Sequence, residues 1–297
     1  MSFCGKCKEE LLSVRLSHCC QSAYVYGLLL FGRSFSIQRI ALQTGNPEVA
    51  QGYCDALQSA YGVSATVKQG GSLRPTYVAE VESESDRLKI LASYDFGMTE
   101  EYIENDLFVR DCCFASFLRG AFLACGNIND PEKEYRLEWN IKKEKIALEL
   151  QALLWQRGIG VTLSSRSSGF QLYTKDSTTV EEILALMGAS RSAMELMDTK
   201  IIKEVKNNMN RARNCDGWNI SKTVEASIRQ RQAIAKLERL DRLESLPQEL
   251  LEAAYLREKN PDASLKELCK LSKESLSLSG LNHRLNKIVS LADNIEE

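Results

Sequence analysis

The chain has 297 residues, of which 44% are hydrophobic and 26% are charged, a composition typical of a soluble globular protein with two or three domains. The formal net charge of −2 excludes a strongly basic chain, so any nucleic-acid-binding protein of this composition must rely on a local basic surface. No apolar stretch approaches the length that spans a bilayer, and the charged segment Lys6–Glu10 does not suit a signal peptide. We therefore expect a cytoplasmic protein with no membrane partner.

The first half of the chain predicts a helix centred on a glycine, a strand, a second helix, two strands and a last helix. Asn46 is a suitable N-cap for the second helix, and the turn Gly70-Gly71 separates the two strands. These elements span, in order, Val25–Arg33, Ser34–Gln43, Pro47–Tyr61, Val63–Lys68, Thr76–Val81 and Ser83–Ala92.

The second half of the chain repeats this order of elements. They span Asp111–Cys125, Glu134–Asn140, Lys142–Arg157, Val161–Ser165, Gly169–Thr174 and Thr179–Met187. Two tandem α-β-α-β-β-α halves predict an α+β fold in which helices cover one side of each sheet. Because Gly27 and Gly120 have no side chain, we expect the two glycine-centred helices to pack closely along a pseudo-twofold axis.

An all-α region follows near Arg191. A helix over Arg191–Asn210 and a long helix over Ser221–Leu240, with Ser221 as its cap, flank the basic segment Arg211–Gly217, which we predict to be a linker and the hinge between domains. Three shorter helices follow, from Leu246-Pro247 to Lys259, over Leu265–Leu271, and over Gly280–Leu291 with Ser279 as cap. The predicted domains are residues 1–95, 96–213 and 214–297.

The last two helices have the lengths and the short connection of a helix-turn-helix unit. In the last helix Leu281, Leu285 and Ile288 recur at helical spacing and predict the face that packs against the core. The opposite side carries residue types that pair with base edges or phosphates. We therefore predict DNA contacts from Ser279, Asn282, His283, Arg284, Asn286 and Lys287, with phosphate contacts from Lys222 and Arg229. The alternative interpretation is the solvated polar face of an ordinary amphipathic helix.

Ten cysteines are spread along the chain, and we expect most of them, such as Cys54 and Cys113, to be small buried apolar residues. One group near the N-terminus is spaced in a way that could enclose a tetrahedral zinc ion: Cys4, Cys7, His18, Cys19 and Cys20. Its second cluster follows closely on the first, and adjacent cysteines are poorly placed to bind one ion together. We therefore predict reduced thiols and no metal or other cofactor, with zinc as the alternative.

The two glycine-centred segments read Val25-Tyr26-Gly27-Leu28-Leu29-Leu30-Phe31-Gly32-Arg33 and Phe117-Leu118-Arg119-Gly120-Ala121-Phe122-Leu123-Ala124-Cys125-Gly126. Both resemble the LAGLIDADG helix of homing endonucleases, whose penultimate residue is an acid that holds a catalytic divalent metal. The corresponding residues here are Gly32 and Cys125, and neither offers the hard oxygen ligand that Mg²⁺ prefers. The resemblance implies a nuclease fold without its chemistry, so we expect no catalytic residues and no enzymatic activity.

Four segments carry a more extensive resemblance: Phe117–Ala124, Asn127–Lys133, Asn219–Ala226 and Ser279–Leu285. With them, nearly the whole chain resembles the WhiA family of bacterial sporulation and cell-division regulators. The resemblance implies an inactive LAGLIDADG region joined to a C-terminal helix-turn-helix that binds promoters in double-stranded DNA. It also implies action on genes for division or sporulation, or on chromosome organisation, and thus a nucleoid-associated location.

Two other functions stay open. A protein-interaction adaptor in cell division or chromosome segregation, without specific DNA contact, fits the near-neutral charge of the chain. An active endonuclease would need carboxylates near the scissile phosphate, but Asp130 and Glu132 lie beyond the second glycine-centred helix, and Asp111 starts it. The internal duplication already supplies a pseudo-dimer and removes the usual need for a second chain, so we expect a monomer. The sequence does not decide the oligomeric state, and it names no protein partner.

Overall fold

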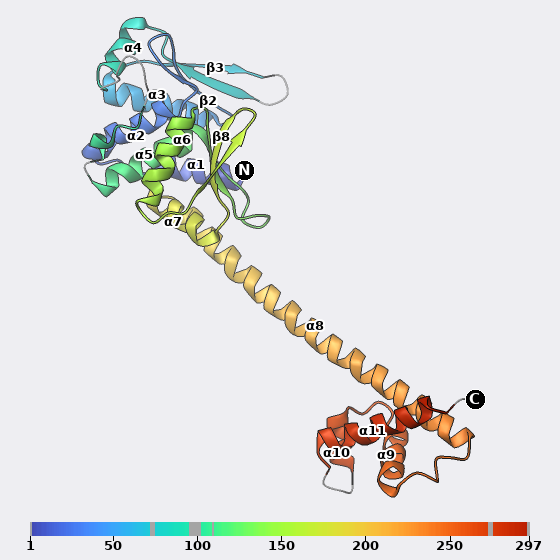
Figure 1. Ribbon diagram of the computed structural model, residues 1–297. Helices are drawn as coiled ribbons and strands as arrows, with labels where there is room; N and C mark the ends of the chain where they lie inside the picture. Colours follow the sequence, from blue (N-terminus) through green and yellow to red (C-terminus); the bar gives the residue numbers. More distant parts are fainter. Residues whose placement is uncertain (1, 72–74, 95–101, 109, 273–275, 296–297) are drawn as a thin grey trace. The chain divides into compact units, whose positions relative to one another are not determined.

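The computed structural model describes residues 2–71, 75–94, 102–108, 110–272 and 276–295, with only the backbone at residues 212, 215–217, 219 and 220. The chain divides into two compact units, Met1–Lys203 and Glu204–Glu297. Unit 1 combines helices with two four-stranded sheets, and unit 2 is helical in its described part (Figure 1). No helix among the described residues is long and apolar enough to cross a membrane.

The first half of unit 1 begins with helices α1 (Phe3–Ser13) and α2 (His18–Leu30). Its sheet has four antiparallel strands in the order β1-β2-β4-β3. Helices α3 (Pro47–Tyr61) and α4 (Glu84–Leu91) complete this half, and α2 and α3 pack against the sheet. The strands are β1 (Ser34–Phe35), β2 (Ile40–Thr44), β3 (Thr66–Gly70) and β4 (Thr76–Glu80).

The second half repeats this arrangement after a 3₁₀ turn at Asn105–Leu107. Helices α5 (Asp111–Cys125), α6 (Glu144–Trp155) and α7 (Ser177–Met187) correspond to α2, α3 and α4. The sheet order is β5-β6-β8-β7, the same topology as in the first half. The strands are β5 (Gly126–Ile128), β6 (Leu137–Ile141), β7 (Thr162–Arg166) and β8 (Gly169–Thr174). The predicted tandem α+β halves are therefore confirmed.

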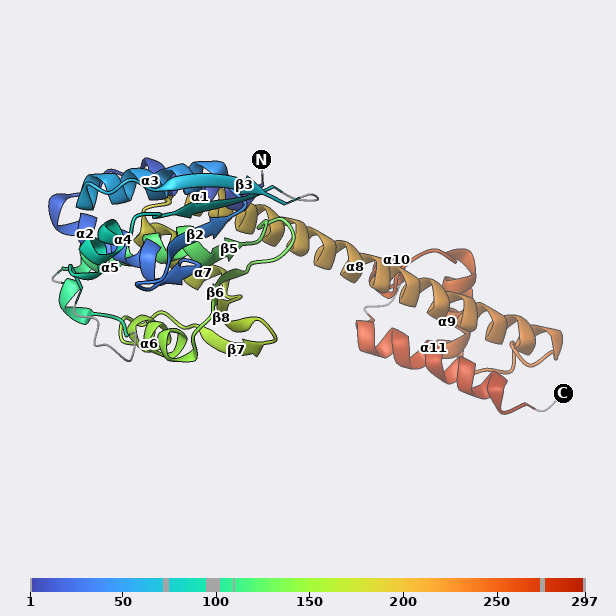
Figure 2. The same cartoon turned by 90° about the horizontal axis from the view of Figure 1, so that it is seen from above.

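Helices α2 and α5 pack side by side within the core of unit 1 (Figures 1 and 2). The contact is backbone to backbone at two glycines. A Cβ atom on Gly27 would lie 2.2 Å from the carbonyl oxygen of Phe117, and one on Gly120 would lie 2.2 Å from that of Tyr24. Both distances are too short for any side chain, so the predicted close packing at these glycines is confirmed.

Several helix boundaries in unit 1 follow from local signals. The Asn46 side chain accepts a hydrogen bond from the backbone N of Val49 at 3.1 Å and caps α3, as predicted. Gly62 ends this helix in the left-handed region, with φ of 65°. Asp176 caps α7 in the same way as Asn46, because its carboxylate accepts from the backbone N of Thr179 at 2.7 Å.

Three elements of unit 1 differ from the sequence-based prediction. The expected strand Ser34–Gln43 is two strands, because reciprocal backbone hydrogen bonds between Ser36 and Arg39 close a turn within it. Strand β5 and helix α1 were not predicted. Charged residues obscured the apolar face of α1, on which Phe3, Cys7 and Leu11 are buried at a spacing of four.

Helix α8 (Ser190–Arg239) begins in unit 1 and continues into unit 2. Its first turn is capped by the buried carboxylate of Glu10, which accepts from the backbone N of Arg191 and Ser192 at 2.7 and 2.9 Å. The backbone stays helical through 211–217, so the linker predicted there, with a new cap at Ser221, is wrong. A single glycine in a helix costs only about 1 kcal/mol, which its neighbours offset.

In unit 2 the end of α8 packs with α9 (Gln248–Lys259), α10 (Leu265–Leu271) and α11 (Leu278–Asp293). One core joins the four helices, with Ile234, Ala254, Leu268 and Leu285 fully buried in it. These helices have the order and lengths of the predicted helix-turn-helix region.

Candidate nucleic-acid interface

Helix α11 presents one buried and one exposed face. Leu281, Leu285 and Ile288 are fully buried, which confirms the predicted core side of this helix. The opposite side is exposed, and it carries the polar residues Asn282, His283, Asn286 and Lys287. These four side chains recur at three- and four-residue spacing, so they form one row along the helix. Such a row has the residue types and the geometry that a major groove requires.

Two of the predicted DNA-binding residues of α11 differ from expectation. Ser277, and not Ser279, is the N-cap: its hydroxyl accepts from the backbone N of Gly280 at 3.1 Å, and Ser279 is exposed in the first turn. The Arg284 side chain is only 16% exposed and forms an ion pair with Glu249 of α9 at 3.3 Å. To contact a base, Arg284 would have to leave this partner, whereas Asn282 and Asn286 are already on the surface.

The connections around α10 hold the two helices of the motif in place. Ser264 and Glu267 form a reciprocal capping box at the start of α10. The buried guanidinium of Arg257 donates to Gln230 of α8 at 2.9 Å and to the carbonyl oxygen of Ala263 at 2.6 Å. One side chain therefore ties α9 to α8 and to the segment before α10, so the motif rests on a fixed support.

The predicted phosphate-binding residues of α8 are also exposed. Lys222 lies over the Trp218 ring, with its Nζ 5.2 Å from the ring centroid. Arg229 forms an exposed ion pair with Asp293 at the end of α11, at 3.2 Å. Six basic residues against two acidic ones occupy the stretch 206–231 of this helix. This stretch is the local basic surface that the overall charge of the chain does not provide.

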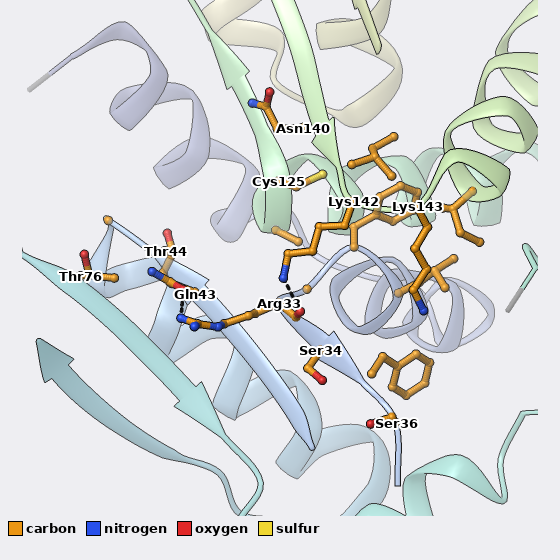
Figure 3. A pocket seen from close by; sticks show the side chains of 18 residues that line it. Arg33, Ser34, Ser36, Gln43, Thr44, Thr76, Cys125, Asn140, Lys142 and Lys143 are labelled. Atoms are coloured by element: carbon orange, nitrogen blue, oxygen red, sulfur yellow. Dashed lines mark hydrogen bonds between the residues drawn. The ribbon is translucent and has the colours of Figure 1, made fainter. Parts of the chain in front are cut away.

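A pocket of about 610 Å³ lies where α2 and α5 end, the place where the LAGLIDADG resemblance would put catalytic metal ions (Figure 3). Gly32 and Cys125 both line it, as the motif requires. None of the described residues that line this pocket is acidic, and three of them are basic: Arg33, Lys142 and Lys143. The chain therefore brings cations to a place where a nuclease needs carboxylates.

The charged groups of this pocket are held by local hydrogen bonds. Lys142 donates through Nζ to the carbonyl oxygen of Arg33 at 2.6 Å, and the Arg33 guanidinium donates to Gln43 (Figure 3). Burial, and then the positive charge of Arg33, lowers the pKa of Lys142. Burial raises the pKa of the Cys125 thiol to about 12, so at neutral pH it is protonated and adds no negative charge to this pocket.

The acidic residues available to an endonuclease lie elsewhere in the chain. Asp111 and Cys125 are at opposite ends of the 15-residue helix α5, so they lie about 20 Å apart. Asp130 closes a local turn after β5, where its carboxylate accepts from the backbone N of Glu132 at 2.9 Å. The structure therefore does not bring these three acids to the pocket at the end of the helix pair.

The N-terminal residues considered for zinc do not gather at one point. Cys7 is fully buried in the core, where burial raises the pKa of its thiol to about 12, and Cys4 packs against that core. Cys19 and Cys20 instead meet a second adjacent pair, Cys112 and Cys113. This cluster was not predicted from the sequence, although one signal was present: in both halves two cysteines precede the crossing glycine by the same spacing. Cys54 and Cys113 are buried, as predicted.

Comparisons with known proteins agree with this architecture. The model of the WhiA LAGLIDADG-like domain matches residues 114–206, and that of the WhiA C-terminal HTH domain matches residues 209–292. A relative from Oceanobacillus iheyensis, named a probable cell division protein WhiA, is 34% identical over 100% of this chain and 98% of its own length. The chain belongs to the WhiA family. A second WhiA relative, from Caldicellulosiruptor saccharolyticus, is 33% identical over 100% of this chain and 96% of its own.

Two solved structures show the same fold. Full-length DUF199/WhiA from Thermatoga maritima superposes with a TM-score of 0.61 at 22% identity and covers 100% of both chains. The N-terminal LAGLIDADG domain of DUF199/WhiA gives a TM-score of 0.51 at 20% identity, over 63% of this chain and 92% of that one. The predicted WhiA membership and the predicted fold, LAGLIDADG-like halves followed by a helix-turn-helix, are therefore confirmed.

Proposed function

We propose that this WhiA-family chain is a transcriptional regulator that binds double-stranded DNA at the promoters of cell-division or sporulation genes and has no nuclease activity. Helix α11 enters the major groove, and the basic stretch of α8 contacts phosphates. The LAGLIDADG-like halves serve as a scaffold. In this proposal the functional domains are residues 1–95, 96–213 and 214–297. The protein is a monomer and is associated with the nucleoid.

The single observation that carries the proposal is the exposed row on α11. A helix that buries Leu281, Leu285 and Ile288 could expose any polar residues, and surface helices commonly expose Lys and Glu. This row has two asparagines, a histidine and a lysine, and no acid. Asparagine pairs with the N6 and N7 atoms of adenine through two hydrogen bonds, a geometry that a solvated surface does not need.

Asn286→Ala and Lys287→Ala separate the two kinds of DNA contact. Binding of the full chain to promoter fragments is measured by fluorescence anisotropy across a salt series. Asn286→Ala is expected to cost about 1–3 kcal/mol on the preferred site and little on unrelated DNA, because it removes base recognition. Lys287→Ala is expected to weaken binding to all sequences and to reduce the salt slope by about 1, because it removes one phosphate contact.

Lys259→Ala is the matched control for these variants. Lys259 is an exposed lysine at the end of α9, in the same unit but outside the α11 row, so its loss is expected to leave affinity nearly unchanged. Equal effects of Lys259→Ala and Lys287→Ala would show that the chain binds DNA only through its general charge. No effect of either Asn286→Ala or Asn282→Ala would remove α11 as the recognition helix.

The absence of nuclease activity is tested separately. Supercoiled plasmid is incubated with the full chain and Mg²⁺ or Mn²⁺ and then examined for nicks. Intact plasmid is expected, because cations occupy the place of the metal-binding acids. Metal-dependent cleavage that disappears in an Asp130→Asn variant would refute the proposal, and light scattering of the same sample tests the monomer.

An adaptor function without DNA contact has one observation in its favour. The first part of α8 exposes a row of large apolar side chains: Met194, Met197, Ile201, Ile202, Val205 and Met209. Exposed apolar rows of this kind serve protein contacts. If the full chain passes through a DNA column at low salt without retention, the adaptor replaces the regulator as the better interpretation.

A further inference from the structure

Four cysteines that the proposed function does not use meet at the N-terminal end of the α2–α5 pair. Cys19 and Cys20 are the second and third residues of α2, and Cys112 and Cys113 hold the same positions in α5. Their four sulfur atoms all lie within 4.8 Å of one another. The Sγ atom of Cys19 is 3.8 Å from that of Cys20 and 3.9 Å from that of Cys112.

The cluster follows the internal symmetry of unit 1. The Cys20 thiol donates to the carbonyl oxygen of Cys112 at 3.3 Å, and the Cys113 thiol donates to that of Cys19 at 3.3 Å. The pseudo-twofold rotation that exchanges the two halves of unit 1 also exchanges these two hydrogen bonds. In each half six residues separate the cysteine pair from the glycine at which the helices cross. Because the glycines set the closest approach of the helices, equal spacing brings the two cysteine pairs together.

We propose that these four cysteines form a structural zinc site that joins the two halves of unit 1. Zinc–sulfur bonds of about 2.3 Å in a tetrahedron place the sulfur atoms about 3.8 Å apart. The shortest separations already have this value, and the longest would have to shrink by about 1 Å. Separations this short suit a single tetrahedral ion better than the larger iron–sulfur clusters.

The surroundings suit the charge of such a site. Binding one Zn²⁺ releases four thiol protons to solvent and leaves a tetrathiolate of charge −2. The N-terminal ends of α2 and α5 carry partial positive charge, which stabilises the negative charge of the thiolates once zinc has displaced their protons. Cys20 and Cys112 line a pocket whose described lining also includes two basic residues, Arg15 and Arg119, and one acidic residue, Asp111. Arg119 is buried, and its Nη1 atom has no hydrogen-bond partner among the described residues.

A disulfide between Cys19 and Cys112 is the competing use of the cluster. It requires a sulfur–sulfur distance of about 2.05 Å, so these atoms would have to approach by nearly 2 Å. It would also leave Cys20 and Cys113 without a function. Zinc uses all four thiols with smaller movements. The exposed Cys19 and Cys112 give the ion access from solvent, and the buried Cys20 and Cys113 hold it on the inner side.

The zinc content of the full-length chain tests the site. When it is purified under reducing conditions after growth with added zinc, the chain is expected to hold one zinc ion. Its cobalt form is expected to show the absorption of a tetrahedral tetrathiolate. Cys19→Ser/Cys112→Ser is expected to lose the metal. The matched control Cys4→Ser/Cys269→Ser, which removes two half-buried cysteines outside the cluster, is expected to keep it.

Alkylation of the wild-type chain decides the question even if the double variant does not fold. Zinc is expected to slow the modification of Cys19 and Cys112 by roughly tenfold or more relative to the zinc-free chain, and to leave Cys269 unchanged. The proposal is overturned if the loaded wild-type chain holds no zinc, or if folded Cys19→Ser/Cys112→Ser holds as much. Iron in place of zinc, or a Cys19–Cys112 disulfide in chain isolated without reductant, overturns it as well.

Discussion

Gly120→Ala is expected to force apart the two helices at the centre of unit 1. The added Cβ would lie 2.2 Å from the carbonyl oxygen of Tyr24 and 2.9 Å from the backbone N of Leu28. Both are backbone atoms, so no side-chain rotation relieves the clash, and α2 and α5 must separate by about 1 Å to restore ordinary contact distances. A gap of this size removes roughly a quarter to a half of the dispersion energy along the contact.

We expect a net loss of about 2 kcal/mol. Overpacking of a rigid core costs about 3 kcal/mol at the upper end of its usual range, and the better helix propensity of alanine returns about 1 kcal/mol. For a unit of this size that loss lowers the midpoint of thermal unfolding by about 4–8 °C. Near-ultraviolet circular dichroism can follow the transition, because Phe117 packs with Tyr26, Phe108 and Phe114 at this contact.

Gly160→Ala is the control for this experiment, because a Cβ atom there meets nothing within 4 Å. It is expected to leave the midpoint nearly unchanged. If Gly120→Ala unfolds at the same temperature as Gly160→Ala, the backbone contact does not constrain the helices. The close packing of α2 and α5 at these glycines would then not explain how the two cysteine pairs come together.

Three further changes test individual interactions. Glu10→Gln is expected to destabilise unit 1 by about 1–2 kcal/mol in thermal unfolding, because the buried carboxylate caps α8 through charge-assisted hydrogen bonds. A variant as stable as the wild type would refute that role. Glu249→Ala removes a negative charge and the ion-pair partner of Arg284, so DNA affinity is expected to rise, most at low salt, and an unchanged affinity counts against α11 as the DNA-binding helix. The hydrogen bonds from the backbone N and hydroxyl of Thr179 lower the pKa of Asp176, so its contribution is present above the ordinary aspartate pKa and is lost as the pH falls through the lowered value. Asp176→Asn should therefore be less stable than the wild type at neutral pH, with a difference in urea midpoint that shrinks on acidification.

Much of the fold was predictable because local signals and global repetition agree. Helix α10 and strand β8 have the predicted bounds, and Asn46 caps α3 as expected. The errors occur where one signal stands alone. Gly217 and its polar neighbours suggested a linker, but a glycine inside a long helix is a small penalty that surrounding residues outweigh.

The two faces of the candidate helix α11 were predictable from the sequence, and the contacts of its individual residues were less so. Helical spacing gave the buried face of α11 correctly, and so also its exposed polar row. It could not show that Arg284 pairs with Glu249, because that contact joins residues 35 positions apart on different helices. The cysteine cluster was missed for the same reason. Its members are distant in sequence, and each adjacent pair looks unsuitable for metal until the other half supplies the remaining ligands.

The proposed loss of nuclease chemistry involves more than two missing acids. Placing carboxylates at positions 32 and 125 would set them in a pocket that already holds Arg33, Lys142 and Lys143, and close cations favour ion pairs over Mg²⁺ coordination. The position of Gly32 adds a steric limit, because a Cβ there lies only 3.0 Å from the carbonyl oxygen of Ala41. A return to cleavage would therefore need new surroundings as well as new ligands. The basic lining of the pocket is therefore suited to attract phosphate groups, and among the described residues it offers no acidic ligand to a metal ion.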